Sequence, residues 1–168
     1  DTYDGLRDDL NLQGKPVYVP VASESAADAR LFLPQHHDYT IPDEDALQRT
    51  IVVPAEPRQR GLAVYPSGAK LLAAFRRANQ FATQPEPNPE RVFDQLADGL
   101  VEQFELADQI TPTVEADTRC VIAVTGSTYG APDTFDHLLT SFVAVGAAIA
   151  FNTPTRITVQ RVDDHDFV

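Results

Sequence analysis

The chain has 168 residues and is strongly acidic, because 25 aspartates and glutamates against 13 basic residues give a net charge of −12. Its single cysteine, Cys120, excludes an internal disulfide and a zinc site built from several cysteines. No run approaches the roughly 20 apolar residues that a membrane-spanning helix needs. We therefore expect a cytoplasmic protein with no membrane partner.

The basic residues are unusual in kind. Only two of the 13 are lysines, Lys15 and Lys70, and the others are arginines. An acidic, lysine-poor composition is typical of proteins in molar intracellular salt, which screens the self-repulsion of the surface charges. An ordinary acidic protein is the alternative. Phosphate neutralisation needs clustered basic residues, and the only adjacent pair is Arg76-Arg77. We therefore expect no nucleic-acid partner.

The N-terminal half is predicted to be rich in strands, at 16–22, 50–53 and 62–65. Pro20 places the first of them at a sheet edge or a bulge, because proline cannot donate to a ladder. The second and third should pair antiparallel, since residues 54–61 are too few for a parallel crossover. Residues 23–45 read as a loop.

Two amphipathic helices are predicted in the middle of the chain. Ser67 can cap the first, whose apolar face runs to Phe81. A proline-rich joint follows at 84–89. Asn88 as cap and Pro89 in the first turn start the second helix, which should end near Ala107.

The C-terminal part, 118–162, predicts a strand, a turn, a long helix and a strand. The first strand centres on the apolar run 120–124, of the kind that a sheet covered on both faces requires. The helix should open at Pro132-Asp133 and end at Asn152, before an alternating strand at 157–160. This order is typical of a right-handed βαβ unit with two parallel strands.

Together these elements predict an α/β fold with a mixed sheet of about five strands, three main helices and a C-terminal βαβ unit. We expect one domain over 1–168. It consists of a β-rich half (1–83), the joint (84–89) and an αβαβ half (90–168).

One candidate ligand site lies at the turn between the strand and the long helix. Backbone amides and hydroxyls at such a turn can cradle a phosphate beside the positive end of a helix. The residues that would contribute are Gly126, Ser127, Thr128, Gly130 and His137. The alternative is a tight turn before a helix capped by Asp133 and Asp136, whose charges would oppose a phosphate.

Other constellations of reactive residues are weaker. His36-His37-Asp38 and His165 suit a solvated loop and tail better than a metal site, since adjacent histidines point to opposite faces. Ser127, Asp133 and His137 supply the residue types of a catalytic triad without the nucleophile-elbow sequence. We therefore assign no catalytic residue, no metal site and no cofactor, and leave enzymatic activity open.

The helix predicted over 135–151 is apolar on nearly every face. Such a helix is buried, either within its own domain or against a partner. The sequence thus favours a non-enzymatic regulatory or protein-interaction module of a halophilic cytoplasm, forming a homo-oligomer or binding a partner protein through this helix. The alternative is a small-ligand or phosphate-binding protein, with or without catalysis, that uses the Gly126–Gly130 turn.

The salt hypothesis makes a direct prediction. Lowering KCl from molar to millimolar concentration should unfold the protein, because unscreened repulsion among its acidic groups then destabilises the compact state. Far-ultraviolet circular dichroism measures this loss. An identical spectrum at both salt concentrations would contradict the hypothesis.

Overall fold

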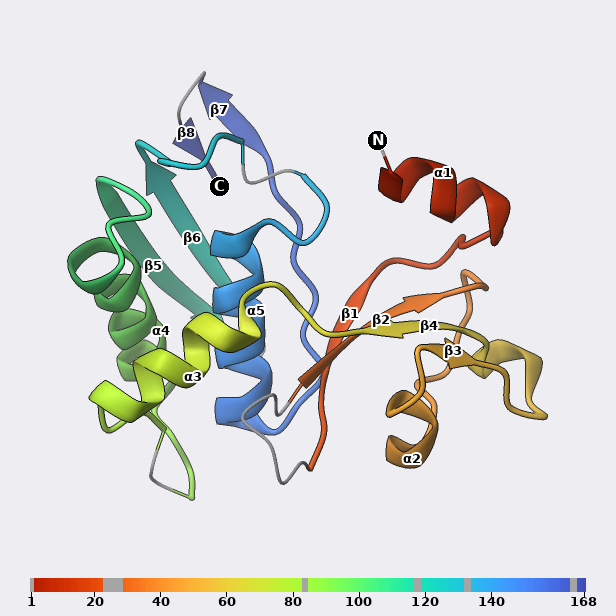
Figure 1. The fold of residues 1–168 in the computed structure, drawn as a ribbon. Helices are drawn as coiled ribbons and strands as arrows, with labels where there is room; N and C mark the ends of the chain where they lie inside the picture. The colour runs from red at the N-terminus through yellow and green to blue at the C-terminus, as the bar shows by residue number, and fades with distance from the viewer. Residues whose placement is uncertain (1, 23–28, 83–84, 117–118, 132–133, 164–165) are drawn as a thin grey trace.

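The computed structural model describes residues 2–22, 29–82, 85–116, 119–131, 134–163 and 166–168 (Figure 1). Within them lie five α-helices and two four-stranded antiparallel sheets. The fold is α/β, but the prediction of one mixed sheet of about five strands with three helices is wrong in detail. The elements are α1 (Thr2–Asp9), β1 (Val17–Pro20), β2 (Ala29–Pro34), α2 (Glu44–Leu47), β3 (Ile51–Val52), the 3₁₀ turn η1 (Pro57–Gln59), β4 (Gly61–Val64), α3 (Ala69–Ala78), α4 (Pro89–Asp98), the π-helical turn η2 (Gly99–Gln103), β5 (Gln109–Ala116), β6 (Arg119–Thr125), α5 (Leu138–Phe151), β7 (Arg161–Asp163) and β8 (Asp166–Phe167).

The first sheet has the strand order β1-β2-β4-β3. The predicted strands are confirmed as β1, β3 and β4, Pro20 lies in an edge strand, and β3 pairs antiparallel with β4. Sequence reasoning missed β2, because its run of buried residues has no polar alternation. Arg30 stays buried in this strand because its guanidinium lies 3.6 Å from the centre of the Tyr65 ring and donates to the Gln48 carbonyl oxygen at 3.0 Å.

The second sheet has the strand order β5-β6-β8-β7. The predicted closing strand at 157–160 does not form, because the strand after α5 is β7 at Arg161–Asp163. The two strands around the long helix are parallel, as predicted, but they are not neighbours. β8 pairs antiparallel with both β6 and β7, so β6 and β7 run in the same direction with β8 between them. The chain after α5 therefore returns one strand position further out than a βαβ unit would place it. β5, also missed, tolerates Pro112 because it is an edge strand.

The start of α4 follows the sequence closely. The Asn88 side chain accepts from the Arg91 amide at 3.0 Å, and Pro89 occupies the first turn, as predicted. The helix does not continue to Ala107, since the π-helical turn η2 follows Asp98. Ser67 was expected to cap α3, but Gly68 holds that position and the Ser67 side chain bonds elsewhere.

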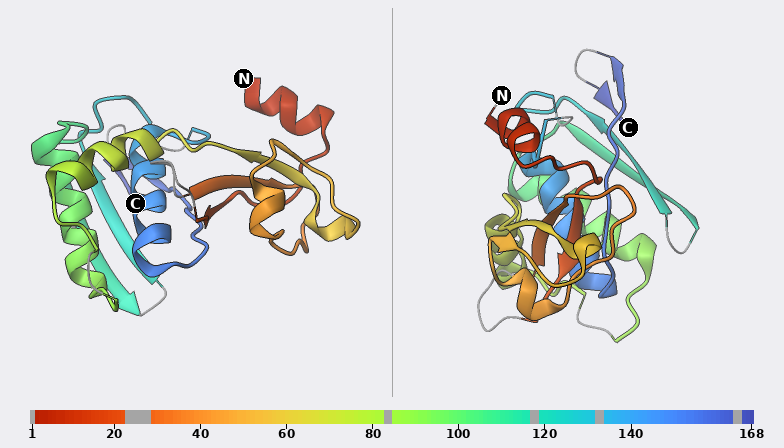
Figure 2. Two further views of the ribbon diagram at one scale, coloured as in Figure 1. Left: turned by 60° about the horizontal axis from the view of Figure 1, so that its bottom comes forward. Right: turned by 90° about the vertical axis from the view of Figure 1, so that its right-hand side faces the viewer.

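Helix α5 lies between the two sheets (Figures 1 and 2). It packs against β1, β2, α3 and α4, and residues 141–148 are all buried. Its first residue is Leu138, capped by His137, so the helix begins later than predicted; Pro132 and Asp133 lie outside the described residues. Asn152 ends it in the left-handed conformation at φ 47°. Burial within its own domain thus accounts for most of its apolar surface.

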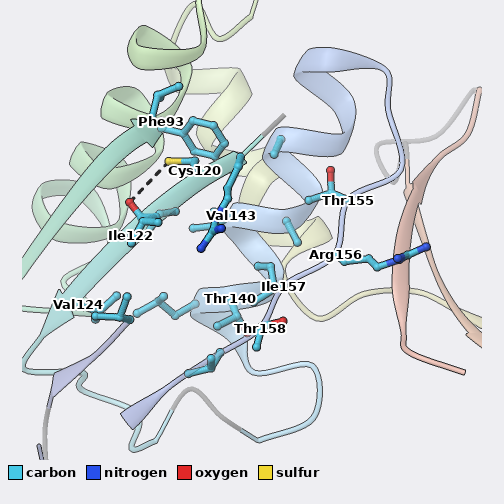
Figure 3. Close-up of a pocket in the computed structure, with 18 of the residues that line it drawn as sticks. Phe93, Cys120, Ile122, Val124, Thr140, Val143, Thr155, Arg156, Ile157 and Thr158 are labelled. Carbon is cyan, nitrogen blue, oxygen red and sulfur yellow. Dashed lines mark hydrogen bonds between the residues drawn. The ribbon is translucent and has the colours of Figure 1, made fainter. Parts of the chain in front are cut away.

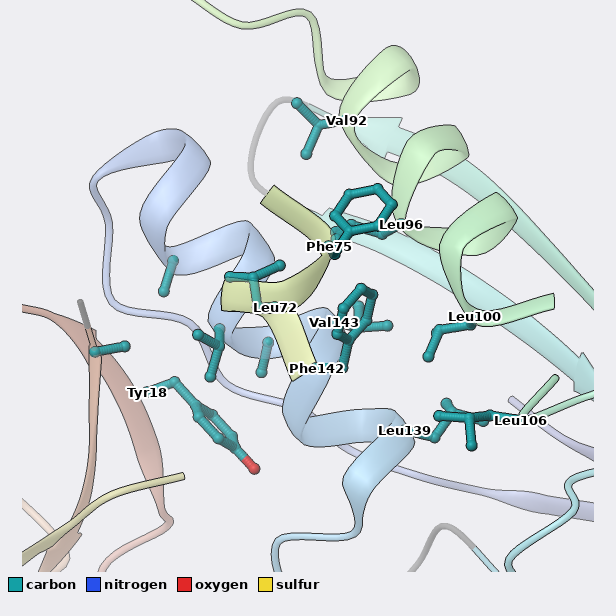
Figure 4. Packing of buried hydrophobic residues seen from close by; sticks show 14 of the residues in the cluster. Tyr18, Leu72, Phe75, Val92, Leu96, Leu100, Leu106, Leu139, Phe142 and Val143 are labelled. Atoms are coloured by element: carbon teal, nitrogen blue, oxygen red, sulfur yellow. The ribbon is translucent and has the colours of Figure 1, made fainter. Parts of the chain in front are cut away.

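Close packing around α5 depends on small residues. The rings of Phe75 in α3 and Phe142 in α5 meet edge to face, with centroids 5.7 Å apart (Figure 4). A side chain on Gly68 would overlap the backbone of Phe142, and one on Gly146 would overlap Leu96 of α4. The neighbouring elements therefore approach α5 as closely as backbone allows.

Replacing Gly68 with alanine should cost on the order of 1–3 kcal/mol of unfolding free energy, as overpacking of a core does. The φ of this residue is −74°, so the cost comes from the contact with α5 and not from backbone strain. Gly5→Ala is the matched control, because a methyl group there meets nothing within 4 Å. Denaturant unfolding in molar KCl compares the two, and equal stabilities would refute this account of the packing.

Candidate binding groove

The structure brings the predicted ligand loop and His137 together. Gly126 and Gly130 adopt positive φ angles of 67° and 82°, which glycine permits. Ser127 Oγ donates to the Gly130 carbonyl oxygen at 2.7 Å, and Nε2 of His137 lies 3.3 Å from the Tyr129 carbonyl oxygen. The loop is therefore an ordered turn held by its own hydrogen bonds.

The side chains that would contact a phosphate at this loop already bond to other protein groups. Thr128 donates through Oγ1 to the Glu105 carbonyl oxygen at 3.0 Å, and Nδ1 of His137 accepts from the Leu139 amide at 3.2 Å. The Asp108 carboxylate lies where a side chain on Gly126 would point. Phosphate binding at this turn stays a prediction, and these contacts do not favour it.

A larger concave site, which sequence reasoning missed, lies elsewhere. A groove of about 740 Å³ opens between β6 and residues 153–160. Thr140, Val143, Ala144 and Ala147 of α5 form its floor (Figure 3). Pro89 and Phe93 of α4, Phe167 of β8 and the following Val168 also contribute to the lining. None of Gly126, Ser127, Thr128, Gly130 and His137 contributes to it.

The groove exists because β6 is covered less than its sequence suggests. Its apolar run predicted a strand buried on both faces, yet Cys120, Val121 and Ile122 are only half-buried and Ala123 is exposed. The segment after α5 does not pair with β6, and its one β-bridge joins Thr155 to Tyr18 of the first sheet. One signal was available in the sequence: residues 156–160 alternate polar and apolar, as a chain with one covered face does.

The chemistry of the groove is that of a binding surface. Among the described residues that line it there is no histidine, aspartate or glutamate. Its two arginines are engaged at the rim. Arg119 lies 3.0 Å from Glu115 in an exposed ion pair, and Arg156 donates to the Tyr39 hydroxyl at 3.0 Å. The remaining titratable group, Cys120, lies on the β6 wall.

The Cys120 thiol is held in its neutral form. Burial raises its pKa above the ordinary value, and the charges of Asp94 and Glu115 act in the same direction. A nucleophilic cysteine needs the opposite shift and a nearby base. Cys120 is therefore a poor candidate for catalysis.

A second polar cluster joins the start of α5 to the first sheet. The Tyr18 hydroxyl donates to Asp136 Oδ1 at 3.0 Å, and the Ser67 amide donates to Oδ2 at 2.7 Å. Ser141 Oγ accepts from the Gly68 amide at 2.9 Å. Burial and then the Asp136 charge raise the pKa of Tyr18 well above its ordinary value, so the phenol stays neutral. This cluster clamps β1, the α3 entrance and α5 together.

Comparison with known proteins gives the family. A family model described as domain of unknown function DUF7982 matches residues 1–168, so the chain belongs to this family. Neither the curated proteins nor the solved structures contain a match to it. Over the described part of the chain, no group of three or more histidine, cysteine or acidic residues is arranged to hold a metal ion. No helix among the described residues is both long and apolar enough to cross a membrane.

The state of Cys120 can be measured by alkylation. The rate of its reaction with iodoacetamide should rise with pH around an apparent pKa higher in the folded protein than in the denaturant-unfolded chain, because burial favours the neutral thiol. Mass spectrometry of timed samples gives both profiles. A folded profile at or below the unfolded one would contradict the assigned environment.

Proposed function

We propose that the protein is a non-enzymatic interaction module of a halophilic cytoplasm, and that it holds a segment of a partner protein in the groove between β6 and residues 153–160. The observation that carries this proposal is the lining of the groove. It combines half-buried apolar side chains with the absence of acidic and histidine side chains among its described residues. Such a surface can bind, but it offers no acid–base pair for catalysis.

The size of the groove also supports an occupant. A volume of about 740 Å³ is far larger than the ~30 Å³ that one water molecule takes up in the liquid. Its walls are mixed, with apolar side chains beside threonines, a glutamine and two arginines, and hydrating the apolar part is unfavourable. A partner segment that covers Ile122, Val143 and Ile157 would remove this surface from water.

A partner would contact the apolar helix predicted over 135–151, which is α5 in the structure, through the groove. Most of α5 is enclosed by β1 and β2 of the first sheet and by α3 and α4. Thr140, which is half-buried, and Val143 and Ala147 line the groove floor. A partner protein or a second copy of this chain would thus reach α5 from the groove side.

The distribution of charge supports the halophilic part of the proposal. Wherever the structure describes their exposure, the acidic side chains other than Asp136 and Asp166 are exposed. A shell of carboxylates on a core of ordinary apolar packing suits molar salt, which screens the net charge of −12. The same charge disfavours nucleic acid and anionic membrane surfaces as partners.

Peptide display in molar KCl tests the proposal. Random extended peptides selected on the wild-type protein should bind in the groove, and Thr140→Arg should weaken the best of them by about tenfold or more, because a long charged side chain then fills the groove, a cost of about 1.4 kcal/mol. Thr50→Arg is the matched control, since Thr50 is exposed and lies outside the groove. Fluorescence anisotropy gives the affinities.

Two results would count against an interaction module. One is a selection that enriches no peptide, or only peptides indifferent to Thr140→Arg. The other is a thermal shift with a nucleotide, flavin or phosphorylated metabolite that Ser127→Ala abolishes, which would favour the small-ligand alternative at the Gly126–Gly130 turn. Light scattering adds a third readout: a dimer that Thr140→Arg dissolves would identify the partner as a second copy.

A further inference from the structure

We propose that the partner segment binds in the groove as an extended β-strand, in line with β8, hydrogen-bonded to β6 on one side and to residues 156–159 on the other. This inference rests on the proposed function and specifies how the segment binds and what sequence pattern it carries. The second sheet would then gain a continuous strand where it now has a gap.

The directions of the strands define a position for one more strand. β6 and β7 run the same way, and β8 fills the single position between them. However, β8 pairs with β6 only at Val124 and Thr125. Residues 153–160, which lead into β7, continue alongside the groove opposite the rest of β6 (Figure 3). The groove is therefore the unfilled part of the position that β8 occupies.

The β6 wall presents an open strand edge. Pairing with β5 uses one edge of β6 along its whole length. In an antiparallel strand, alternate residues direct their N–H and C=O groups to opposite edges, so part of the backbone of 119–123 faces the groove. Successive side chains of a strand point to opposite faces, yet all the residues from Arg119 to Ile122 line the groove. This also indicates that the backbone edge of β6 forms the wall. Among the described residues, this edge of 119–123 has no backbone partner.

The opposite wall is a segment, 156–159, that backbone hydrogen bonds hold at both ends. Thr155 and Tyr18 exchange two backbone hydrogen bonds of 2.8 Å, and Gln160 and Val168 exchange bonds of 2.6 and 2.8 Å. Between these points, 156–159 makes no backbone hydrogen bond to another described residue. Two segments with unpaired backbone groups, 119–123 and 156–159, therefore face each other across the groove floor. β-strand addition uses such unpaired groups.

The bonds of Val168 show that the position accepts a strand. With Phe167 opposite Val124, the register places Val168 opposite Ala123, at the entrance of the groove. Val168 already bonds to Gln160 of the far wall. A strand that continues this line would lie antiparallel to both walls. The open part of β6, 119–122, can pair with about four residues of such a strand, each of which spans about 3.4 Å.

The far wall and the floor of the groove specify the pattern of the occupant. Residues 156–160 alternate between exposed and half-buried side chains, whereas on β6 Cys120, Val121 and Ile122 are all half-buried. A strand between them has one face on α5 and one in water, so it should carry apolar residues at every second position and polar residues between. A one-residue shift would turn its apolar side chains toward solvent.

The experiment joins such a strand to the protein itself. Adding Val-Thr-Val-Thr after Val168 places the valines on the α5 side, because Phe167 is buried and Val168 is exposed. The tether supplies a high effective concentration, so no knowledge of the natural partner is needed. We expect the iodoacetamide reaction of Cys120 to slow by about tenfold or more through burial of the groove, and the melting temperature in molar KCl to rise.

Two matched extensions serve as controls. Thr-Val-Thr-Val has the same composition in the opposite phase, and Val-Thr-Pro-Thr replaces one inward residue by proline, which removes a donor and disturbs the ladder. Neither should protect Cys120. Equal protection by the two opposite phases would overturn strand addition. Protection by decanoate but by no extension would instead assign the groove to an acyl chain and also overturn it.

The outcomes separate this inference from the function on which it rests. If display-selected peptides bind in a Thr140-dependent manner and the in-phase extension neither protects Cys120 nor displaces them, strand addition fails and the interaction module stands. If the extension protects Cys120 but no groove-dependent peptide is ever selected, the interaction function fails. Protection together with loss of peptide binding supports both.

Discussion

Everything in this structure depends on the enclosure of α5. Its residues 141–148 are all buried, which requires partners around most of the helix, and the groove lies along the remaining side. Gly68 and Gly146 let neighbouring elements reach its backbone, and Asp136 ties its start to Tyr18 of the first sheet. The helix packs on β1 and β2 of the first sheet and on α4, which in turn packs on β5 of the second sheet. The rigidity of the groove floor follows from this arrangement.

The groove results from the path of the chain after α5, beside β6 of the second sheet. After α5 the chain returns to the second sheet, but Thr155 is bonded to Tyr18 of the first sheet, which holds the returning segment away from β6. Only the last residues of the described chain fill the space between them, as β8. The edge of β6 and the backbone of 156–159 thus remain open, and we propose that the groove between them holds a segment of another chain, which completes the sheet.

Local signals in the sequence predicted local structure well. Asn88-Pro89 gave the start of α4, Asn152 gave the end of α5, and the hairpin of β3 and β4 followed from its short connection. What failed was the pairing of distant segments. The apolar run of β6 is consistent with two covered faces, and no residue near it indicates that β8 separates it from β7. For the same reason the sequence pointed to the Gly126–Gly130 turn, whose glycines are adjacent in the chain, and missed a groove formed by segments that are far apart in the sequence.

The central claim is that β6 has an open edge in the free protein. Residue-resolved amide hydrogen exchange of the wild-type chain in molar KCl tests it most directly. We predict alternating protection along 119–123, in which amides bonded to β5 exchange slowly and those directed into the groove exchange fast. Slow exchange at every one of these amides would mean that the edge is already paired, and would contradict the account.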